Sequence, residues 1–272
     1  MNLCILDSSD ALQTLPLEDR RSRHILRVLK KKEGDLFRAG SPDGLVGSAC
    51  LESMSDEQLV LRFIPECAAP PLRPVRVMLG TVRPIQAARI VKELTILGVA
   101  GITFFPTELG EKSYTQSNFY SQKEYFIHAR DGAEQAGNPR IPHISLVWSL
   151  KKTLEQVLAT EISEGLPFLP SGDGVDGLRS ADNIPHDGRV QGPRTTNIIC
   201  HPDSSALPLT RIPLLATPVV LAIGTERGWT ASELEQFQES GFTMCSLGDR
   251  ILKTETAAVA AVSVLLSRLG YF

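Results

Sequence analysis

Two glycine-containing turns near the carboxyl end of the chain carry charged side chains that could do chemistry. The first, "GTERG" from Gly224 to Gly228, holds Glu226, whose carboxylate could accept a proton or a hydrogen bond. The second, "LGDR" from Leu247 to Arg250, holds a guanidinium that could bind phosphate or stabilise a developing oxyanion. Two structural interpretations stand beside these: Glu226 stabilises its own turn, and Arg250 pairs with Glu255.

Each turn lies between a predicted strand and a predicted helix. The run "TPVVLAI" from Thr217 is short and β-branched, as is typical of a buried parallel strand. The helix after the first turn is specified at both ends, because Thr230 and Glu233 have capping-box spacing and Gly241 follows the last turn. Ligands of open α/β sheets bind at the carboxyl ends of strands, where glycine lets the backbone approach them. The pattern therefore predicts a ligand site.

Strands alternate with helices from residue 75 onward, which predicts a parallel sheet covered on both faces. We expect helices over 84–99, 118–137 and 151–162, and a mobile insertion over the Gly-, Asp- and Arg-rich residues 171–196. The final helix, which Thr254 could cap, is apolar from Ala257 to Leu266 except at Ser263. Such a helix is expected to be buried on all sides, in the core or at a subunit interface.

The amino-terminal quarter has a different pattern. Residues 1–68 read as a small β-rich domain with one helix, and the proline-rich residues 65–74 suit a stiff interdomain linker. The helix is basic: residues 20–32 hold seven Lys and Arg and no acid, and Gly34 is expected to end it. The other 259 residues carry 21 bases and 31 acids, a net charge of −10. A basic island on an acidic protein predicts nucleic-acid contact; the alternative is a solvated helix face.

Composition argues against several classes of protein. At 272 residues and 42% hydrophobic, the chain is that of an ordinary globular protein, without the run of about 18 uncharged apolar residues that a membrane span requires. The amino terminus carries acids and does not look like a signal peptide, so we expect a cytoplasmic protein. The five cysteines and five histidines are scattered, which predicts reduced, mostly buried thiols and no metal site. "GTERGW" fits neither the P-loop nor the dinucleotide-binding pattern.

The two turns together resemble a paired family signature. "IGTERGW" and "LGDRILKTETA" are similar to IGPEGGF followed by LGxRILRxETA in the bacterial small-subunit ribosomal RNA uracil-N3 methyltransferases, which belong to the knotted SPOUT superfamily. "HILRVLKKKEGD", "ILGVAGITFFPTELGEKS" and "EQAGNPRIPHI" resemble further motifs of that family. The resemblance therefore extends over nearly the whole chain.

The resemblance implies an α/β fold: a PUA-like RNA-binding domain over 1–68 and a SPOUT methyltransferase domain with a trefoil knot over 75–272, packed as a homodimer through the knot. It implies S-adenosylmethionine as cofactor and a uridine of small-subunit ribosomal RNA as substrate. The implied cofactor-binding residues are Gly224, Glu226, Gly228, Leu247, Gly248, Ile251 and Leu252. The implied RNA-binding residues are Arg23, His24, Arg27, Lys30, Lys112 and Arg140.

Glu226 and Arg250 are then the candidate catalytic residues. N3 of uracil is a poor nucleophile while protonated, so the enzyme must help to remove that proton and must align the nitrogen with the methyl group. The target base must also be unpaired, because N3 lies on its pairing edge.

The chain departs from the family pattern in several places. Thr225 replaces Pro, Arg227 replaces Gly, Asn138 replaces Arg and Lys253 replaces Arg. Arg227 could fill part of the cofactor pocket or point away to a phosphate. The departures leave two further hypotheses: a non-catalytic RNA-binding assembly factor of the same fold, and a methyltransferase with a different RNA target.

Overall fold

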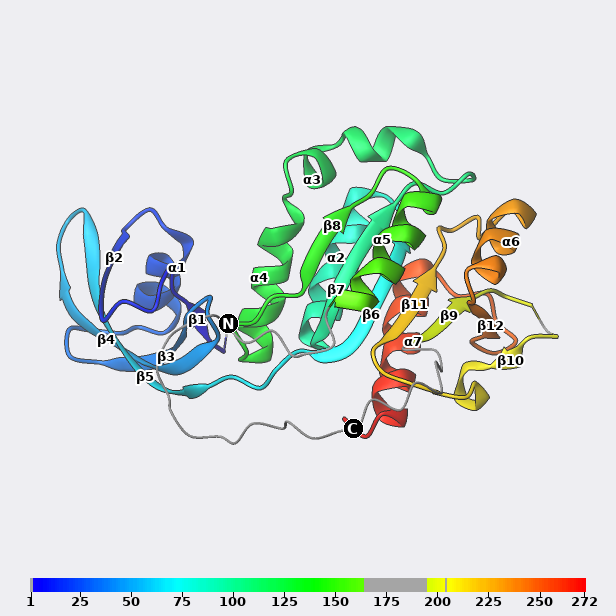
Figure 1. Ribbon diagram of the computed structural model, residues 1–272. Helices are drawn as coiled ribbons and strands as arrows, with labels where there is room; N and C mark the ends of the chain where they lie inside the picture. Colours follow the sequence, from blue (N-terminus) through cyan, green and yellow to red (C-terminus); the bar gives the residue numbers. More distant parts are fainter. Residues whose placement is uncertain (1, 164–194, 204) are drawn as a thin grey trace.

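The computed structural model describes residues 2–163, 195–203 and 205–272 (Figure 1). The strands within these ranges form a five-stranded sheet of order β1-β3-β4-β5-β2 and a seven-stranded sheet of order β10-β12-β9-β11-β6-β7-β8. The insertion expected over 171–196 lies outside the described residues up to residue 194.

The five-stranded sheet is built by the amino-terminal residues. Its strands are β1 Cys4–Ile5, β2 Leu12–Pro16, β3 Leu36–Gly40, β4 Leu45–Met54 and β5 Gln58–Ala68. Alternate residues of β5, Leu59, Leu61 and Phe63, point into a core that Ile25 also enters. This period of two explains why the sequence pattern predicts strands here.

The basic segment forms a shorter helix than expected. It consists of α1 Arg20–Arg23 and a π-helical turn, η1 His24–Val28. Lys30 has φ 52° and Lys31 N donates to Ile25 O at 3.1 Å, which is the left-handed ending in which glycine is more usual. The expectation that Gly34 ends this helix is therefore wrong.

Arg21, one of the basic residues of this segment, faces inward. The residue is 6% exposed, and its guanidinium binds Asp7 at 2.8 Å and Asp19 at 2.7 Å. These contacts hold the pKa of both carboxyls below the usual value of 3.8, mainly through the hydrogen bonds to Arg21. Arg21 therefore stabilises the small domain and is not free to bind a phosphate.

The seven-stranded sheet is parallel in every pairing, as predicted. Its strands are β6 Arg73–Gly80, β7 Val99–Phe105, β8 His143–Leu146, β9 Thr196–Cys200, β10 Leu207–Pro208, β11 Val219–Ile223 and β12 Thr243–Ser246. The helices are α2 Pro84–Ile96, η2 Lys112–Gln116, α3 Asn118–Ser121, α4 Tyr125–Ala136, α5 Leu150–Ser163, η3 Leu209–Arg211, α6 Ala231–Glu239 and α7 Thr254–Arg268.

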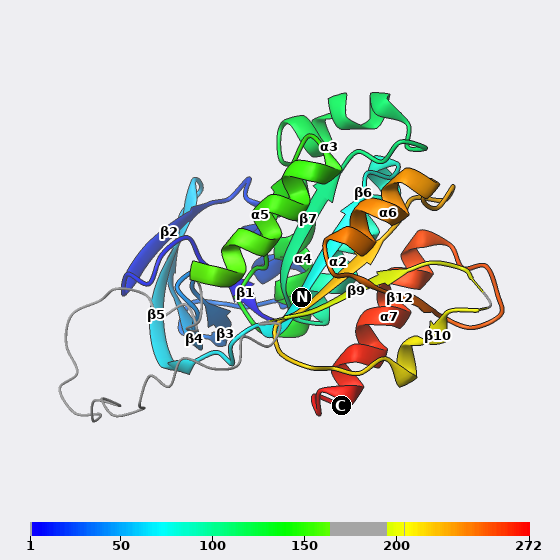
Figure 2. The same cartoon turned by 45° about the vertical axis from the view of Figure 1, so that its right-hand side comes forward.

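Helices cover both faces of this sheet (Figure 2). In β11, Val219, Leu221 and Ile223 pack in the core shared with α2 and α7, whereas Val220 and Ala222 pack in the core shared with α5 and α6. A strand buried on both faces has no polar positions, which is why β11 reads as a continuous apolar run.

Two further predicted boundaries are wrong. The helix expected over 118–137 breaks into α3 and α4, because Lys123 between them has φ 58°. The linker expected over 65–74 is shorter, since β5 continues to Ala68 and β6 begins at Arg73. The connection is also held in place, with Ala69 N donating to Gly44 O at 2.7 Å.

The final helix also differs from expectation. Its N-cap residue is Lys253, without a side-chain cap, and Thr254 is the first helical residue. One face is buried, while Val259, Ala260 and Val264 are partly exposed. The core of the single chain therefore does not bury α7 on all sides, and burial at a subunit interface stays a prediction.

Three further sequence expectations concern single features. No helix within the described ranges is long and apolar enough to cross a membrane. The cysteines are free, but only Cys4 and Cys245 are buried, so "mostly buried" is wrong. The trefoil knot stays a prediction.

The two sheets are joined by apolar and polar contacts. Leu3, Ile5 and Val46 form a cluster with Ala133 of α4. Beside it, the side chain of Glu134 accepts a hydrogen bond from Arg20 at 2.9 Å, and its backbone carbonyl accepts from Asn2 N and Leu3 N at 3.1 Å each. The amino-terminal strand is thereby fixed to α4.

We expect Arg21→Met to lower the free energy of unfolding by about 2 kcal/mol at neutral pH, since charged hydrogen bonds are lost. Both Asp pKa values are lowered by folding, so their stabilisation is complete above pH 3.8 and is lost as pH falls below it. The difference between variant and wild type should therefore shrink in acid. Urea unfolding at pH 7 and pH 3 measures this, with exposed Arg23→Met as control. An equal effect of the two variants at pH 7 would contradict the role of Arg21.

Candidate functional site

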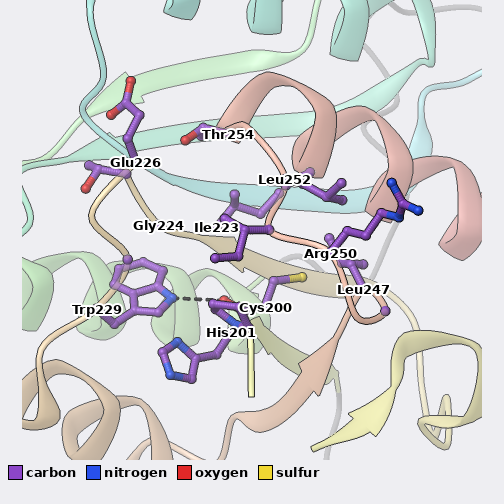
Figure 3. A pocket seen from close by; sticks show the side chains of 16 residues that line it. Cys200, His201, Ile223, Gly224, Glu226, Trp229, Leu247, Arg250, Leu252 and Thr254 are labelled. Atoms are coloured by element: carbon purple, nitrogen blue, oxygen red, sulfur yellow. Dashed lines mark hydrogen bonds between the residues drawn. The ribbon is translucent and has the colours of Figure 1, made fainter. Parts of the chain in front are cut away.

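The parallel pairing brings three chain segments to one edge of the sheet (Figure 3). Ile223, the last residue of β11, pairs with Leu79 of β6 on one side and Cys200 of β9 on the other. Cys245 of β12 also pairs with Cys200. The segments that follow β9, β11 and β12 must therefore emerge side by side.

These segments form a pocket. It is lined by all seven residues that the sequence assigned to the cofactor: Gly224, Glu226, Gly228, Leu247, Gly248, Ile251 and Leu252. The other lining residues are Cys200, His201, Pro202, Ile223, Thr225, Trp229, Arg250, Thr254 and Ala257. The two glycine turns, although more than twenty positions apart in sequence, thus contribute to a single concave surface.

The glycines have distinct structural roles at this pocket. Gly228 and Gly248 have φ values of 70° and 111°, which favour glycine. Gly224 lies against Trp229, and a Cβ atom on it would be 3.1 Å from Trp229 Cε2. The indole Nε1 of Trp229 donates to the Cys200 carbonyl at 3.0 Å, which ties the first turn to the end of β9.

The helix after the first turn is held by a network around Glu233. The predicted capping box is confirmed: Glu233 N donates to Thr230 Oγ1 at 3.2 Å, and Thr230 N donates to Glu233 Oε2 at 2.9 Å. The other oxygen of Glu233 accepts from Glu108 N at 2.8 Å, and Thr230 Oγ1 donates to Glu108 Oε2 at 2.7 Å. The loop after β7 is therefore fixed to the start of α6.

The two candidate catalytic side chains lie at opposite ends of the pocket view in Figure 3. Glu226 and Arg250 are both exposed, and neither forms a hydrogen bond or ion pair with another described residue. Glu255 lies 3.5 Å from Arg89 instead. Neither structural interpretation is therefore found among the described residues, and both side chains are free to meet a ligand.

Two of the lining residues that the sequence did not assign carry polar atoms that are unpartnered among the described residues. Thr225 Oγ1 and His201 Nδ1 are buried atoms without a hydrogen-bond partner in the described part of the protein. Buried polar atoms are nearly always hydrogen-bonded in native proteins, so both favour a polar ligand. The sequence held a signal for His201, because this residue directly follows the apolar run that forms the end of β9, where ligands of parallel sheets bind.

Arg227 lies outside the pocket. Its side chain is exposed and is not among the lining residues. Of the two orientations that the sequence left open, the structure has the one that points away from the pocket.

The predicted RNA-binding residues are not brought together with the pocket. The segment that carries Arg23, His24, Arg27 and Lys30 belongs to the small sheet, at the other end of the molecule in Figure 1. Arg23, Arg27 and Lys30 are exposed. Partial burial lowers the pKa of His24 below its usual 6.5, which disfavours the charged form of this side chain.

Lys112 and Arg140 occupy two further positions. Lys112 begins η2 and is exposed. Arg140 is partly buried, with Nε donating to Ala69 O at 3.3 Å and the guanidinium packed against Gly44. Arg140 thus has a structural contact near the connection between the two sheets. In the described ranges, no three His, Cys, Asp or Glu side chains are grouped to hold a metal ion.

Comparison with known proteins agrees with this architecture. The RNA methyltransferase domain family matches residues 69–165 and 181–266, and the RNA methyltransferase PUA domain family matches residues 17–64. The chain is 32% identical over 274 residues to ribosomal RNA small subunit methyltransferase E of Treponema pallidum, covering 98% of this chain and 91% of the relative. It is 25% identical over 269 residues to ribosomal RNA small subunit methyltransferase E 1 of Borreliella burgdorferi, covering 99% of each.

Solved structures share the fold. The ribosomal RNA small subunit methyltransferase E from Neisseria gonorrhoeae, bound to S-adenosyl methionine, superposes with a TM-score of 0.70 at 20% identity and covers 98% of each chain. A putative methyltransferase from Legionella pneumophila, in complex with the same cofactor, superposes with a TM-score of 0.68 at 21% identity. The match covers 98% of this chain and 97% of the Legionella chain.

The fold and the domain matches define an RNA methyltransferase domain preceded by a PUA domain. The chain belongs to the family of small-subunit ribosomal RNA methyltransferases E. The resemblance and the fold class read from the sequence are confirmed.

We expect Thr230→Val to lower the free energy of unfolding by about 1 kcal/mol, the usual cost of losing a helix cap. The substitution keeps the volume of the side chain but removes the hydroxyl that contacts Glu108 and Glu233. Thermal unfolding measures the effect, and Ser232→Ala in the exposed first turn of α6 is the control. If both variants unfold at the same temperature as the wild type, the network around Glu233 does not stabilise the turn.

Proposed function

We propose that the protein uses S-adenosylmethionine to methylate N3 of a uridine in small-subunit ribosomal RNA. The observation that carries the proposal is the convergence of the two glycine turns on one pocket. Membership of the family supports the reaction class, and two structures of the same fold carry this cofactor. The choice of uracil and of its N3 atom rests on the resemblance of the two turns to the signature of the uracil-N3 methyltransferases, from which the first turn departs at Thr225 and Arg227.

The pocket has the chemistry that such a cofactor needs. The open backbone at Gly228 and Gly248 leaves peptide groups accessible, and Leu247, Ile251 and Leu252 supply apolar walls. The unpartnered atoms of Thr225 and His201 can bind the polar groups of a ligand. When bound, the cofactor supplies an electrophilic methyl group on a sulfonium sulfur. The first turn, the second turn and the end of β9 would hold it.

The protein's own part in the reaction is to prepare N3. Glu226 would accept the N3 proton, which would leave a lone pair on N3 available to the methyl carbon that the bound cofactor supplies, with the cofactor's sulfur as the leaving group. Arg250, at the other end of the pocket, holds a phosphate of the RNA. The exposed Arg23, Arg27 and Lys30 contact the RNA backbone at a distance from the reaction, which makes binding sensitive to salt.

The homodimer belongs to the same proposal. The face of α7 with Val259, Ala260 and Val264 is apolar and only partly buried in the single chain. Packing against a second copy would remove this surface from water, which is favourable. The cytoplasm, where ribosomal subunits occur, is the compartment that this function requires.

We expect purified protein to convert uridine to N3-methyluridine in small subunits that lack the mark. Glu226→Gln should slow the reaction by about 10² to 10⁴-fold, the usual contribution of a general base. Exposed Glu235→Gln on α6 removes the same charge outside the pocket and should react like the wild type. Mass spectrometry of the nucleosides measures both. Cofactor binding without methylation would favour another RNA target, and absence of binding would favour a non-catalytic assembly factor.

We expect Arg227→Gly to leave the affinity for S-adenosylmethionine within about threefold of wild type, which is less than about 1 kcal/mol. The physical reason is that Arg227 is exposed and does not line the pocket. Calorimetric titration measures the affinity. Leu252→Ala, which truncates a wall of the pocket, should weaken binding about tenfold or more. Binding that appears only after Arg227→Gly would show that Arg227 closes the pocket.

A further inference from the structure

Glu226 projects from the pocket toward a neighbouring loop. In Figure 3 its carboxylate points away from Ile223, Leu247 and Leu252. The loop after β6 lies beside the turn that carries Glu226, because Leu79 and Ile223 are paired at the ends of β6 and β11. The packing is close: a Cβ atom on Gly80 would be 3.0 Å from Thr225 Cγ2 and 3.2 Å from Thr225 N.

This neighbouring loop ends in an exposed arginine. Arg83 is the N-cap residue of α2, and its Nε donates to the hydroxyl of Tyr114 at 3.0 Å. The hydrogen bond to Tyr114 raises the pKa of Arg83, and the negative charge of Glu226 acts in the same direction. The paired ends of β6 and β11, and the close packing of Gly80 on Thr225, place the loops that carry Arg83 and Glu226 next to each other. The two terminal nitrogens of Arg83 make no hydrogen bond or ion pair within the described ranges.

The orientation of Arg83 is fixed from both sides. Its backbone follows Val82, whose N and O both bond to the hydroxyl of buried Tyr120, at 3.2 and 2.8 Å. Its side chain is held by Tyr114, which packs partly against the main core. An exposed arginine without such contacts would sample many rotamers, so these contacts restrict the side chain of Arg83, which is exposed to solvent.

The arrangement matches the edge of a uracil base. N3–H is flanked by the O2 and O4 carbonyls, so the base presents a donor between two acceptors. Glu226 and Arg83, on two adjoining loops, carry the complementary acceptor and donors. Loss of the N3 proton also spreads negative charge onto O2 and O4, where a fixed cation stabilises it.

We propose that Arg83 donates hydrogen bonds to a carbonyl oxygen of the target uracil and so holds N3 against Glu226, with Tyr114 as the residue that positions Arg83. The inference rests on the proposed function and adds a residue that contacts the substrate. It assigns the surface beside the pocket, formed by Arg83, Tyr114 and Glu226, to the target base.

The test compares Arg83→Gln and Arg83→Lys with Arg89→Gln. Arg89 is exposed, lies about one and two-thirds turns further along α2, and forms a surface ion pair with Glu255 at 3.5 Å, of a kind that contributes little to stability. Single-turnover methylation of unmarked small subunits is measured at saturating enzyme. Arg83→Gln should be slower by about 10²-fold, as for loss of one oxyanion donor. Arg83→Lys should recover part of the rate, because lysine keeps the charge without the fork. Arg89→Gln should react like the wild type.

Two readouts separate this role from a structural one. The ratio of the wild-type rate to the Arg83→Gln rate should fall toward alkaline pH, because N3 of uracil loses its proton more readily there. Tyr114→Phe, which removes the hydroxyl that positions Arg83, should lower the single-turnover rate in the same pH-dependent way, by a smaller factor. Affinity for S-adenosylhomocysteine should be unchanged in every variant, since Arg83 does not line the cofactor pocket.

Equal rates for Arg83→Gln and Arg89→Gln would overturn the proposal, as would a pH-independent deficit accompanied by weaker S-adenosylhomocysteine binding. If the wild type does not methylate, the proposed function fails. The role of Arg83 in contacting RNA is then tested by a binding measurement. In the presence of S-adenosylhomocysteine, Arg83→Gln should then bind unmarked small subunits about tenfold more weakly than Arg89→Gln. Equal affinity would contradict the role of Arg83.

Discussion

The hydrogen bonds that join β6, β11, β9 and β12 in parallel determine where the groups of the pocket can meet. In a parallel sheet the carboxyl ends of all strands lie at the same edge of the sheet. The chain segments that follow these neighbouring strands are therefore neighbours as well. Polar groups gather there because the faces of the sheet are filled by apolar residues and covered by helices. The pocket is therefore a consequence of the topology, and its residues contribute the chemistry.

A second constraint links the two sheets. Glu134 of α4 is 2% exposed, and burial raises the pKa of its carboxyl although Arg20 and Arg130 oppose this. A buried carboxylate is stable only with cationic and hydrogen-bonding partners, and Arg20 from the small sheet is one of them. The contact fixes the orientation of the basic segment relative to the larger sheet. An RNA bound at both ends of the molecule would meet a preformed spacing between them.

The departures from the family pattern differ in their physical consequence. Arg227 points into solvent, so the pocket keeps its shape. Asn138 has a contact of its own, because its side chain donates to Pro70 O at 3.0 Å and accepts from Arg140 N at 3.0 Å. It therefore ties the end of α4 to the connection between the sheets. Thr225 adds a hydroxyl to the pocket wall where proline would add none. Nothing in the structure explains Lys253.

Local chemistry determined much of this protein from the sequence alone. Alternating apolar patterns predicted the strands, and the spacing of Thr230 and Glu233 predicted the start of α6. The two glycine turns predicted seven residues that line one pocket. The ends of helices were harder to predict, because Lys30 and Lys123 adopt left-handed backbone conformations that their residue type does not favour. Only the tertiary structure decided that Arg21 faces inward, that Arg227 faces outward and that the loops carrying Arg83 and Glu226 adjoin. These facts depend on strand pairing between distant segments, and no short stretch of sequence contains that information.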